Sequence, residues 1–453
     1  MKKQTSQKRS NCDGVSRRNF VQAGLLGAGG LGLADFLKLK AEGAIHPKQQ
    51  DTSVILFWLS GGPGHMETWD PKPEAPADYR GPFQSIATSL AGAKFGELMP
   101  EQAKLAEHLA VLRTVNHGSG DHTKGNHWML TGFEGPAFNA PDNRVQRRPS
   151  MGSAASFLRG PNQAGMTPYV GVPHLRGGTD NLFHYSSYIG GGSNPFIVES
   201  DPNAAGFSVK NLTLAKNLTL DRLKNRRQLL GSLDVLPRDH EKRFRDLDEH
   251  QQRAFELLAS KDVRSAFDIA AEPDSLRDSY GRHTFGQSAL LARRLVEHGT
   301  TFVTVNCVPW DHHGSPGQYK TEEGARKLIP PLDAAIAGLV RDLMDRGMYE
   351  KTLVVAMGEF GRTPRMNKNA GRDHWGRTFS VLMGCGGMNM GQIIGRSNKH
   401  GENVVERPVS PQDVAATVYR HLGIDPQRVM FRDRLDRPLP LLDTGEAVSE
   451  LFG

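Results

Sequence analysis

The chain has 453 residues, of which 23% are charged and 38% are hydrophobic, and its formal net charge is +7. This composition is typical of a soluble globular protein, and it excludes an integral membrane protein and a disordered chain. Part of the positive charge lies near the N-terminus, in Lys2, Lys3, Lys8, Arg9, Arg17 and Arg18. The rest of the chain carries no block of like charges, so we expect no nucleic-acid partner.

The N-terminal segment predicts export. Arg17 and Arg18 are followed by Phe20 and then by a glycine-rich apolar run, Ala23–Leu33, which is too short for a permanent membrane span. The arginine pair followed by Phe20 resembles a twin-arginine signal, which carries folded proteins across the bacterial inner membrane. We therefore expect residues 1–44 to be a leader that engages the twin-arginine machinery, and the protein to be periplasmic or otherwise exported. The alternative is a basic terminus followed by a buried helix.

The three cysteines do not form a disulfide framework. Cys12 lies in the expected leader. Cys307 and Cys385 stand at the ends of predicted strands, so we expect buried thiols, and a bridge between these two remains open.

The first predicted strand, Asp51–Ser60, runs into a glycine-rich turn that continues to Asp70. Ligand sites in open α/β sheets lie just beyond the carboxyl ends of strands. Glu67 is therefore a candidate metal ligand, whereas Asp70 precedes two prolines and also fits an ordinary turn. A helix is predicted next at Pro100–His108, followed by a strand at Leu109–Val115.

A cluster of histidines follows this strand, in residues 116–132. Asp121 or Thr123 is expected to cap a helix here, and a helix N-terminus at a strand end favours an anion. Thr123 is then a candidate nucleophile, activated by a metal or by His122, and the alternative is a plain helix cap. His127, on the same predicted helix, is a candidate metal ligand.

The middle of the chain, at about residues 148–281, predicts an insertion. It combines glycine- and proline-rich loops with two amphipathic stretches, Leu220–Leu233 and Arg238–Leu258. We expect these helices to cover one face of the main domain, which we place at residues 45–453.

Helices and buried strands alternate again after the insertion. The predicted elements are a helix at Thr284–Glu297, a strand at Thr301–Cys307, a helix at Leu328–Arg346, a strand from Thr352, a strand at Phe379–Gly384 and a helix at Ser410–Leu422. This alternation predicts an α/β fold with a doubly wound, mainly parallel sheet and helices on both faces.

Acidic and histidine side chains follow several of these strands. Asp311 and His313 come after one strand, Glu359 after the next, and the pair Asp373-His374 lies on a glycine-flanked loop. Because parallel strands end on one edge of a sheet, we expect these side chains to converge. Such ligands suit Zn, Mn or Ca, as one ion or as a pair about 3.5–4 Å apart. Hydrogen-bonded core histidines and a surface turn are the alternative.

Several stretches of the chain resemble a known family. They are Ser60–Pro63, Trp128–Gly132, Tyr280–Gly286, Trp310–Gly314, Gly358–Pro364 and Gly371–Trp375. The layout is similar to the alkaline phosphatase superfamily, and more closely to the exported, sulfatase-like DUF1501 family. The resemblance implies that Asp311 and His313 share one metal-ligand position. It also implies that Glu359 replaces the strand-end Asp-His of the superfamily and that His374 is its late histidine.

The chain also departs from the superfamily pattern. The acidic ligand after the first strand is replaced by Ser60-Gly61-Gly62, so Glu67 or Asp70 would have to substitute for it. Where sulfatases carry a Cys-x-Pro-x-Arg motif, this chain has His122–Gly125, with no cysteine to convert to formylglycine. The similar run Cys307–Asp311 ends in Asp where Arg is required, and we reject it as that motif.

These observations predict an exported, metal-dependent hydrolase of sulfate or phosphate esters. Its expected substrate is a small-molecule or polysaccharide ester, and its nucleophile is Thr123 or a water molecule bound to the metal. The alternative is a non-catalytic exported protein that keeps the fold and binds a metal or a carbohydrate.

Overall fold

The computed structural model describes residues 44–46, 51–175, 183–209, 222, 225 and 261–453. Nearly all of the predicted leader, with Arg17, Arg18 and Cys12, lies outside the described residues. The same holds for the predicted helix Arg238–Leu258 and for all but two residues of Leu220–Leu233.

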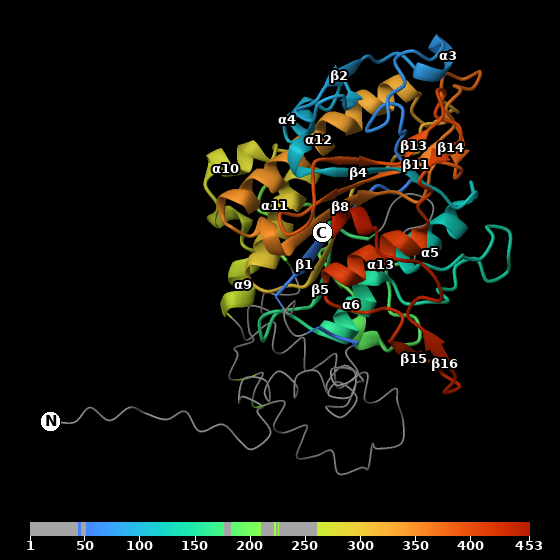
Figure 1. Cartoon of the computed structure of the whole chain (residues 1–453). Helices are drawn as coiled ribbons and strands as arrows, with labels where there is room; N and C mark the ends of the chain where they lie inside the picture. Colours follow the sequence, from blue (N-terminus) through green and yellow to red (C-terminus); the bar gives the residue numbers. More distant parts are fainter. Residues whose placement is uncertain (1–43, 47–50, 176–182, 210–221, 223–224, 226–260) are drawn as a thin grey trace.

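The core of the fold is an eight-stranded sheet (Figure 1). From one edge to the other its strands are β12 (Gln392–Ile394), β4 (Ala110–Val115), β11 (Phe379–Gly384), β8 (Thr352–Met357), β1 (Ser53–Trp58), β7 (Phe302–Asn306), β5 (Tyr169–Val172) and β6 (Phe196–Ile197). β1 lies between β7 and β8 and is parallel to both. The predicted α/β fold with a mainly parallel sheet is confirmed.

In the described part of the sheet, β11 alone runs against its neighbours. It pairs antiparallel with β8 on one side and with β4 on the other. Phe379, its first residue, pairs with Val115, the last residue of β4. The residues that precede β11 therefore lie at the edge where β1, β4, β7 and β8 have their carboxyl ends.

Both faces of the sheet are buried by helices. Successive side chains of a strand point to opposite faces, so Ile55 and Val54 in β1 belong to two different hydrophobic cores. The first core contains α4 (Pro100–Lys104), α11 (Thr284–Glu297) and α12 (Thr321–Asp345). The second contains α5 (His122–Thr131), α6 (Met151–Arg159) and α13 (Pro411–His421). Figure 1 shows the two groups of helices on opposite sides of the strands, which explains why the strands read as continuous apolar runs.

Part of the predicted insertion belongs to the main sheet. β5 pairs parallel with β7, and β6 pairs parallel with β5. The sequence predicted only loops here because β5 is a short run that contains Gly171 and is flanked by Pro168 and Pro173, residues that argue against a strand. The described helices α9 (Lys261–Phe267) and α10 (Asp274–Ser279) follow before α11.

Short two-stranded ribbons and a short helix lie outside the main sheet. Four two-stranded ribbons are present in the described chain: β2 (Ser85–Ala87) with β3 (Lys94–Gly96), β9 (Gly361–Arg362) with β10 (His374–Trp375), β13 (Arg396–Ser397) with β14 (Val404–Glu406), and β15 (Met430–Arg432) with β16 (Pro438–Pro440). A short helix, α3 (Ala77–Arg80), precedes β2.

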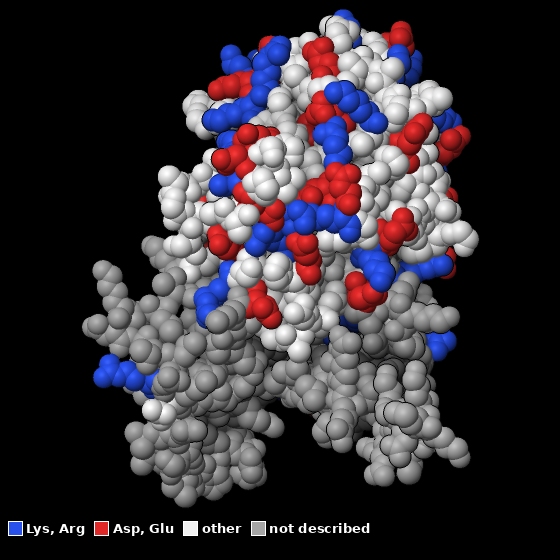
Figure 2. All heavy atoms as spheres, turned by 90° about the vertical axis from the view of Figure 1, so that its left-hand side faces the viewer, with Lys and Arg blue, Asp and Glu red and all other residues white. Residues whose placement is uncertain are grey.

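A buried arginine joins α11 to its surroundings. The side chain of Arg293 is fully buried, and its guanidinium forms ion pairs with Glu272 at 2.7 Å, Glu297 at 2.5 Å and Asp342 of α12 at 2.8 Å. Breaking a buried pair leaves an uncompensated charge, so this group fixes α11 against α12. On the outer face of these helices, basic and acidic side chains are interspersed (Figure 2).

Cys307 and Cys385 are both free and buried, so the described structure has no bridge between them. Within the described chain, every helix is too short or too polar to cross a membrane.

Candidate metal centre

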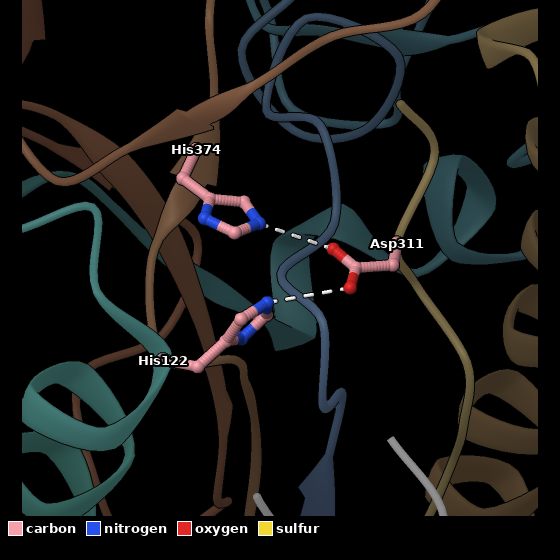
Figure 3. Close-up of side chains that lie close together, drawn as sticks. All are labelled: His122, Asp311 and His374. Atoms are coloured by element: carbon pink, nitrogen blue, oxygen red, sulfur yellow. Dashed lines mark hydrogen bonds and ion pairs between the residues drawn. The ribbon is translucent and has the colours of Figure 1, made fainter. Parts of the chain in front are cut away.

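Three side chains meet at the carboxyl edge of the sheet. One ligand atom from each of His122, Asp311 and His374 lies within 4.8 Å of the other two. Nε2 of His122 is 3.3 Å from Oδ2 of Asp311, and Nε2 of His374 is 3.2 Å from Oδ1. Figure 3 shows both imidazole rings pointing toward the carboxylate between them.

His122 owes its place to the start of α5. Asp121 caps this helix, because its side chain accepts hydrogen bonds from the backbone N–H groups of Thr123 at 2.9 Å and Lys124 at 3.2 Å. Gly132, in the left-handed conformation, ends the helix. His122 is thus the first helical residue, directly at the sheet edge.

Asp311 lies in the loop after β7, which packs tightly on the turn after β1. Gly61 has a φ of +109°, and a Cβ atom there would lie 2.8 Å from the backbone of Trp310 and Asp311. A side chain at position 61 would therefore push the Asp311 loop away. This close approach explains the glycines that the sequence places after the first strand.

His374 reaches the site because of strand direction. It belongs to β10, which pairs antiparallel with β9, and it precedes β11 by a few residues. Since β11 is antiparallel, its amino end lies where the parallel strands have their carboxyl ends. A parallel strand in this position would carry His374 to the opposite edge.

His313 joins the same cluster. Its Nε2 atom is 3.3 Å from Oδ1 of Asp311 and 2.8 Å from Nε2 of His374. The site therefore offers three imidazole nitrogens around one carboxylate.

Each of these three rings is held through its other nitrogen. Nδ1 of His122 is 2.6 Å from Oε1 of Glu359, Nδ1 of His313 is 3.0 Å from Oδ1 of Asp373, and Nδ1 of His374 is 2.8 Å from the backbone oxygen of Gly120. A carbonyl or carboxylate oxygen accepts, so each Nδ1 carries the hydrogen. This arrangement is typical of metal-binding histidines, whose outer hydrogen bond sets the tautomer and aims the Nε2 lone pair at the ion.

Glu359 lies one layer behind the cluster. Its buried carboxylate accepts from the backbone N–H of Gly61 at 2.8 Å and from Nδ1 of His122. Its backbone oxygen is 2.6 Å from Nε2 of His117. The structure therefore places Glu359 against a ligand candidate, with its carboxylate directed to the far side of the His122 ring.

The charged and polar neighbours within the cluster shift the pKa values of its members. Burial opposes a charge on His122, but the carboxylates of Asp311 and Glu359 outweigh burial and raise the pKa of His122 to about 10. Burial also opposes the charge on Asp311, yet its histidine neighbours and an adjacent arginine lower its pKa. Hydrogen bonding to Asp311 raises the pKa of His313, whereas burial lowers that of His374. The cluster thus attracts positive charge, and a metal ion and a proton compete for the same nitrogen.

Other residues predicted for the site lie apart from these atoms. Glu67 is buried, and its carboxylate pairs with the guanidinium of Arg372 at 2.7 Å. His127 points its Nδ1 to the backbone oxygen of Phe133, 2.8 Å away, and burial lowers its pKa to about 4. Asp373 is half-exposed and touches the site through His313.

The hydroxyl of Thr123 is buried and bonded within the protein. Thr123 is 1% exposed, and its hydroxyl donates to Oδ1 of Asp121 at 2.7 Å. The N–H groups at the start of α5, which the sequence suggested for anion binding, are bonded to the same Asp121 carboxylate.

The donor atoms fit a divalent ion. Ligand bonds of about 2.0–2.2 Å place neighbouring tetrahedral donors about 3.4 Å apart, close to the 3.2 and 3.3 Å between Asp311 and its histidines. Imidazole suits Zn and other transition metals, whereas Ca prefers oxygen ligands. A set of imidazoles around one carboxylate therefore favours Zn or Mn over Ca.

One residue of the site was missed by the sequence reasoning. Arg362 follows Glu359 by three residues and is 1% exposed, and its Nη2 lies 2.5 Å from Oδ1 of Asp311. The available signal was its place within Gly358–Pro364, a stretch that already carried the family resemblance.

Comparison with solved structures gives distant likenesses. The lipoteichoic acid synthase LtaP from Listeria monocytogenes is 10% identical, with 86% of this chain and 78% of that chain covered and a TM-score of 0.39. The sulfatase PsFucS1 from Pseudoalteromonas sp. is 14% identical, with coverages of 86% and 72% and a TM-score of 0.38. The phosphonate monoester hydrolase SpPMH from Silicibacter pomeroyi is 12% identical, with coverages of 83% and 73% and a TM-score of 0.35.

No curated protein sequence matches the chain. A family model does, however, and it covers residues 51–452, which include every strand of the main sheet and every residue of the cluster. The chain therefore belongs to the family described as "Protein of unknown function (DUF1501)".

Proposed function

We propose that this protein is an exported, metal-dependent hydrolase of sulfate or phosphate esters. The observation that carries the proposal is the convergence of three Nε2 atoms on one carboxylate, with each ring held at Nδ1 by an acceptor. The resemblance of the sequence to sulfatases and phosphatases supplies the substrate class. A divalent ion at this place would polarise an ester oxygen and lower the pKa of water.

The residues divide into two groups by their contacts. His122, Asp311 and His374 would hold the ion, because one ligand atom from each lies within 4.8 Å of the other two. His313 lies beside them, and its Nε2 atom also accepts from Nη1 of Arg362. Glu359 positions His122 from behind, as Asp373 and the Gly120 carbonyl do for the other two rings.

The contacts of Thr123 favour water as the nucleophile. Attack by Thr123 would require its buried hydroxyl to leave Asp121 and turn toward the cluster. A water molecule needs no such movement, because the side chains of His122, Asp311 and His374 keep between 11% and 21% of their surface exposed. The same opening admits an ester group carried by a small molecule or a polysaccharide.

One observation favours the alternative, a non-catalytic exported protein that binds a metal or a carbohydrate. The predicted nucleophile is bonded to a helix cap, as a structural threonine would be. Turnover and metal binding must therefore be measured separately.

The test uses the purified protein loaded with Zn²⁺ or Mn²⁺ and a panel of aryl sulfates and aryl phosphates. We expect hydrolysis of one ester class and bound metal, and loss of both in His374→Ala. His400→Ala serves as the matched control and should retain both, because His400 is a partly exposed histidine that packs against Tyr79, away from the cluster. Bound metal without turnover would favour the alternative, and absence of bound metal would refute the proposal.

A further inference from the structure

We infer that Arg362 supplies a fixed positive charge to this centre, so that the centre takes one divalent ion rather than a pair. The inference rests on the proposed metal-dependent function. Arg362 was not among the residues predicted from the sequence, and the sequence allowed either one ion or a pair.

Arg362 is completely engaged by the protein. Its N–H groups point to the backbone oxygens of Gly61, Gly62, Trp310 and Arg372, to Oδ1 of Asp311 and to Nε2 of His313. The side chain is 1% exposed. Since every donor has an acceptor within the protein, none remains for a substrate anion. Arg362 is therefore a positioning residue.

These bonds join the loops that form the site. The backbone oxygens belong to the turn after β1, the loop after β7 and the loop that precedes β10. The planar guanidinium has five donors in a rigid arrangement, and a lysine ammonium has three donors on a flexible stem. One guanidinium thus fixes Asp311 relative to both neighbouring loops.

Arg362 also takes the position that a second ion would need. Two ions about 3.5–4 Å apart would both need ligands from this cluster, and Asp311 is the carboxylate that lies within reach of its histidines. The Oδ1 atom of Asp311 is bound by Nη2 of Arg362 at 2.5 Å and also lies 3.2 Å from Nε2 of His374, whereas Oδ2 faces His122. The lone pairs of Oδ1 are therefore already shared between the guanidinium and the histidine side of the first ion. A second ion on Oδ1 would have to displace a buried guanidinium.

The charge balance of the site also favours one divalent ion. With neutral imidazoles, the charged groups counted here are the carboxylates of the partly exposed Asp311 and the buried Glu359, and the guanidinium of the buried Arg362. One divalent ion leaves the group with a net charge of about +1, which suits an anionic ester, and two ions would give about +3. Such an excess is costly where solvent screening is weak.

The experiment compares Arg362→Lys and Arg362→Met, two variants that both lose the rigid guanidinium but differ in charge. The metal-free protein is titrated with Co²⁺, followed by its visible spectrum, and the bound metal is counted per chain. We expect one equivalent for the wild type and for Arg362→Lys. Arg362→Met should bind a second equivalent, or bind the first about tenfold more tightly, because the repulsion is gone. Binding of inorganic phosphate to the Met variant loaded with one equivalent of Co²⁺ should weaken by a similar factor, because one positive charge is missing.

Arg365→Met, at an exposed arginine three residues further on, is the matched control and should behave as the wild type. Equal stoichiometry and affinity in the Lys and Met variants of Arg362 would show that its charge plays no part, and would overturn the inference. If the Met variant does not fold, the number of Co²⁺ equivalents bound by the wild type tests the inference. Two equivalents of Co²⁺, both lost in Asp311→Asn, would overturn the inference while leaving ester hydrolysis intact, whereas no bound metal would refute the proposed function itself.

Discussion

Replacement of Glu359 by glutamine tests whether the carboxylate behind His122 contributes to metal affinity. Glutamine has nearly the same shape as glutamate, so the change removes the charge and little else. The Oε1 atom of Glu359 accepts from Gly61 N–H at 2.8 Å and from Nδ1 of His122 at 2.6 Å. A glutamine oxygen can accept both bonds, but they become neutral ones, and each then contributes about 1 kcal/mol less. Loss of the carboxylate also makes His122 a weaker donor of electrons to an ion. Changes of this kind lower metal affinity by about 10- to 100-fold, or about 1.4–2.7 kcal/mol.

The assay is a competition titration of Zn²⁺ against a chelator of known affinity, with thermal unfolding as a check on folding. We expect the weakest binding for Glu359→Ala, intermediate binding for Glu359→Gln and unchanged binding for Glu446→Gln, an exposed glutamate. Wild-type affinity in a folded Glu359→Gln protein would refute the idea that Glu359 acts through His122. A complete loss of binding in Glu359→Gln would indicate that Glu359 is itself a ligand.

Three further changes address other parts of the chain. Cys307→Ala should lower the free energy of unfolding by about 1–2 kcal/mol through a small cavity, with unchanged metal content, and a mass change on Cys307 in the native protein would contradict its role as a buried thiol. Burial lowers the pKa of His421 to about 4, so below about pH 6.5 His421 is protonated in the unfolded chain but stays neutral in the folded protein. The free energy of unfolding should therefore fall by on the order of 3 kcal/mol as pH drops from 6.5 to 4. In urea titrations, His421→Gln should lack this pH-dependent loss. Arg17→Lys combined with Arg18→Lys should retain the protein in the cytoplasm in cell fractionation, and normal export of this variant would exclude a twin-arginine signal.

The main sheet could be predicted because its strands are buried on both faces. β8, for example, is a continuous apolar run that ends in a glycine-rich turn, and the predicted helix Thr284–Glu297 agrees with α11 at both ends. The direction of β11 could not be predicted, since a fully buried strand has the same composition whether it runs parallel or antiparallel to its neighbours.

The position of the site could be predicted from the sequence, but the role of each side chain in it could not. The rule that strand ends converge brought Asp311, His313 and His374 together in the prediction, and the structure has them in contact. Which side of the His122 ring faces Glu359 depends on how α5 sits on the sheet, and a single sequence does not contain that information. The partner of Glu67 is Arg372, 305 residues away, and a pairing over that distance has no local signal.

The wide spacing of the clustered residues ties ion binding to the stability of the whole fold. Asp311 and His374 are 63 residues apart in the sequence, and His122 and its partner Glu359 are 237 residues apart. An unfolded chain cannot hold these groups together, so an ion bound here would bind only the native state. Each tenfold rise of free ion above the dissociation constant would then add about 1.4 kcal/mol to the free energy of unfolding. Resistance to heat and to proteases should accordingly vary with the metal concentration around the protein, even for a variant that has no catalytic activity.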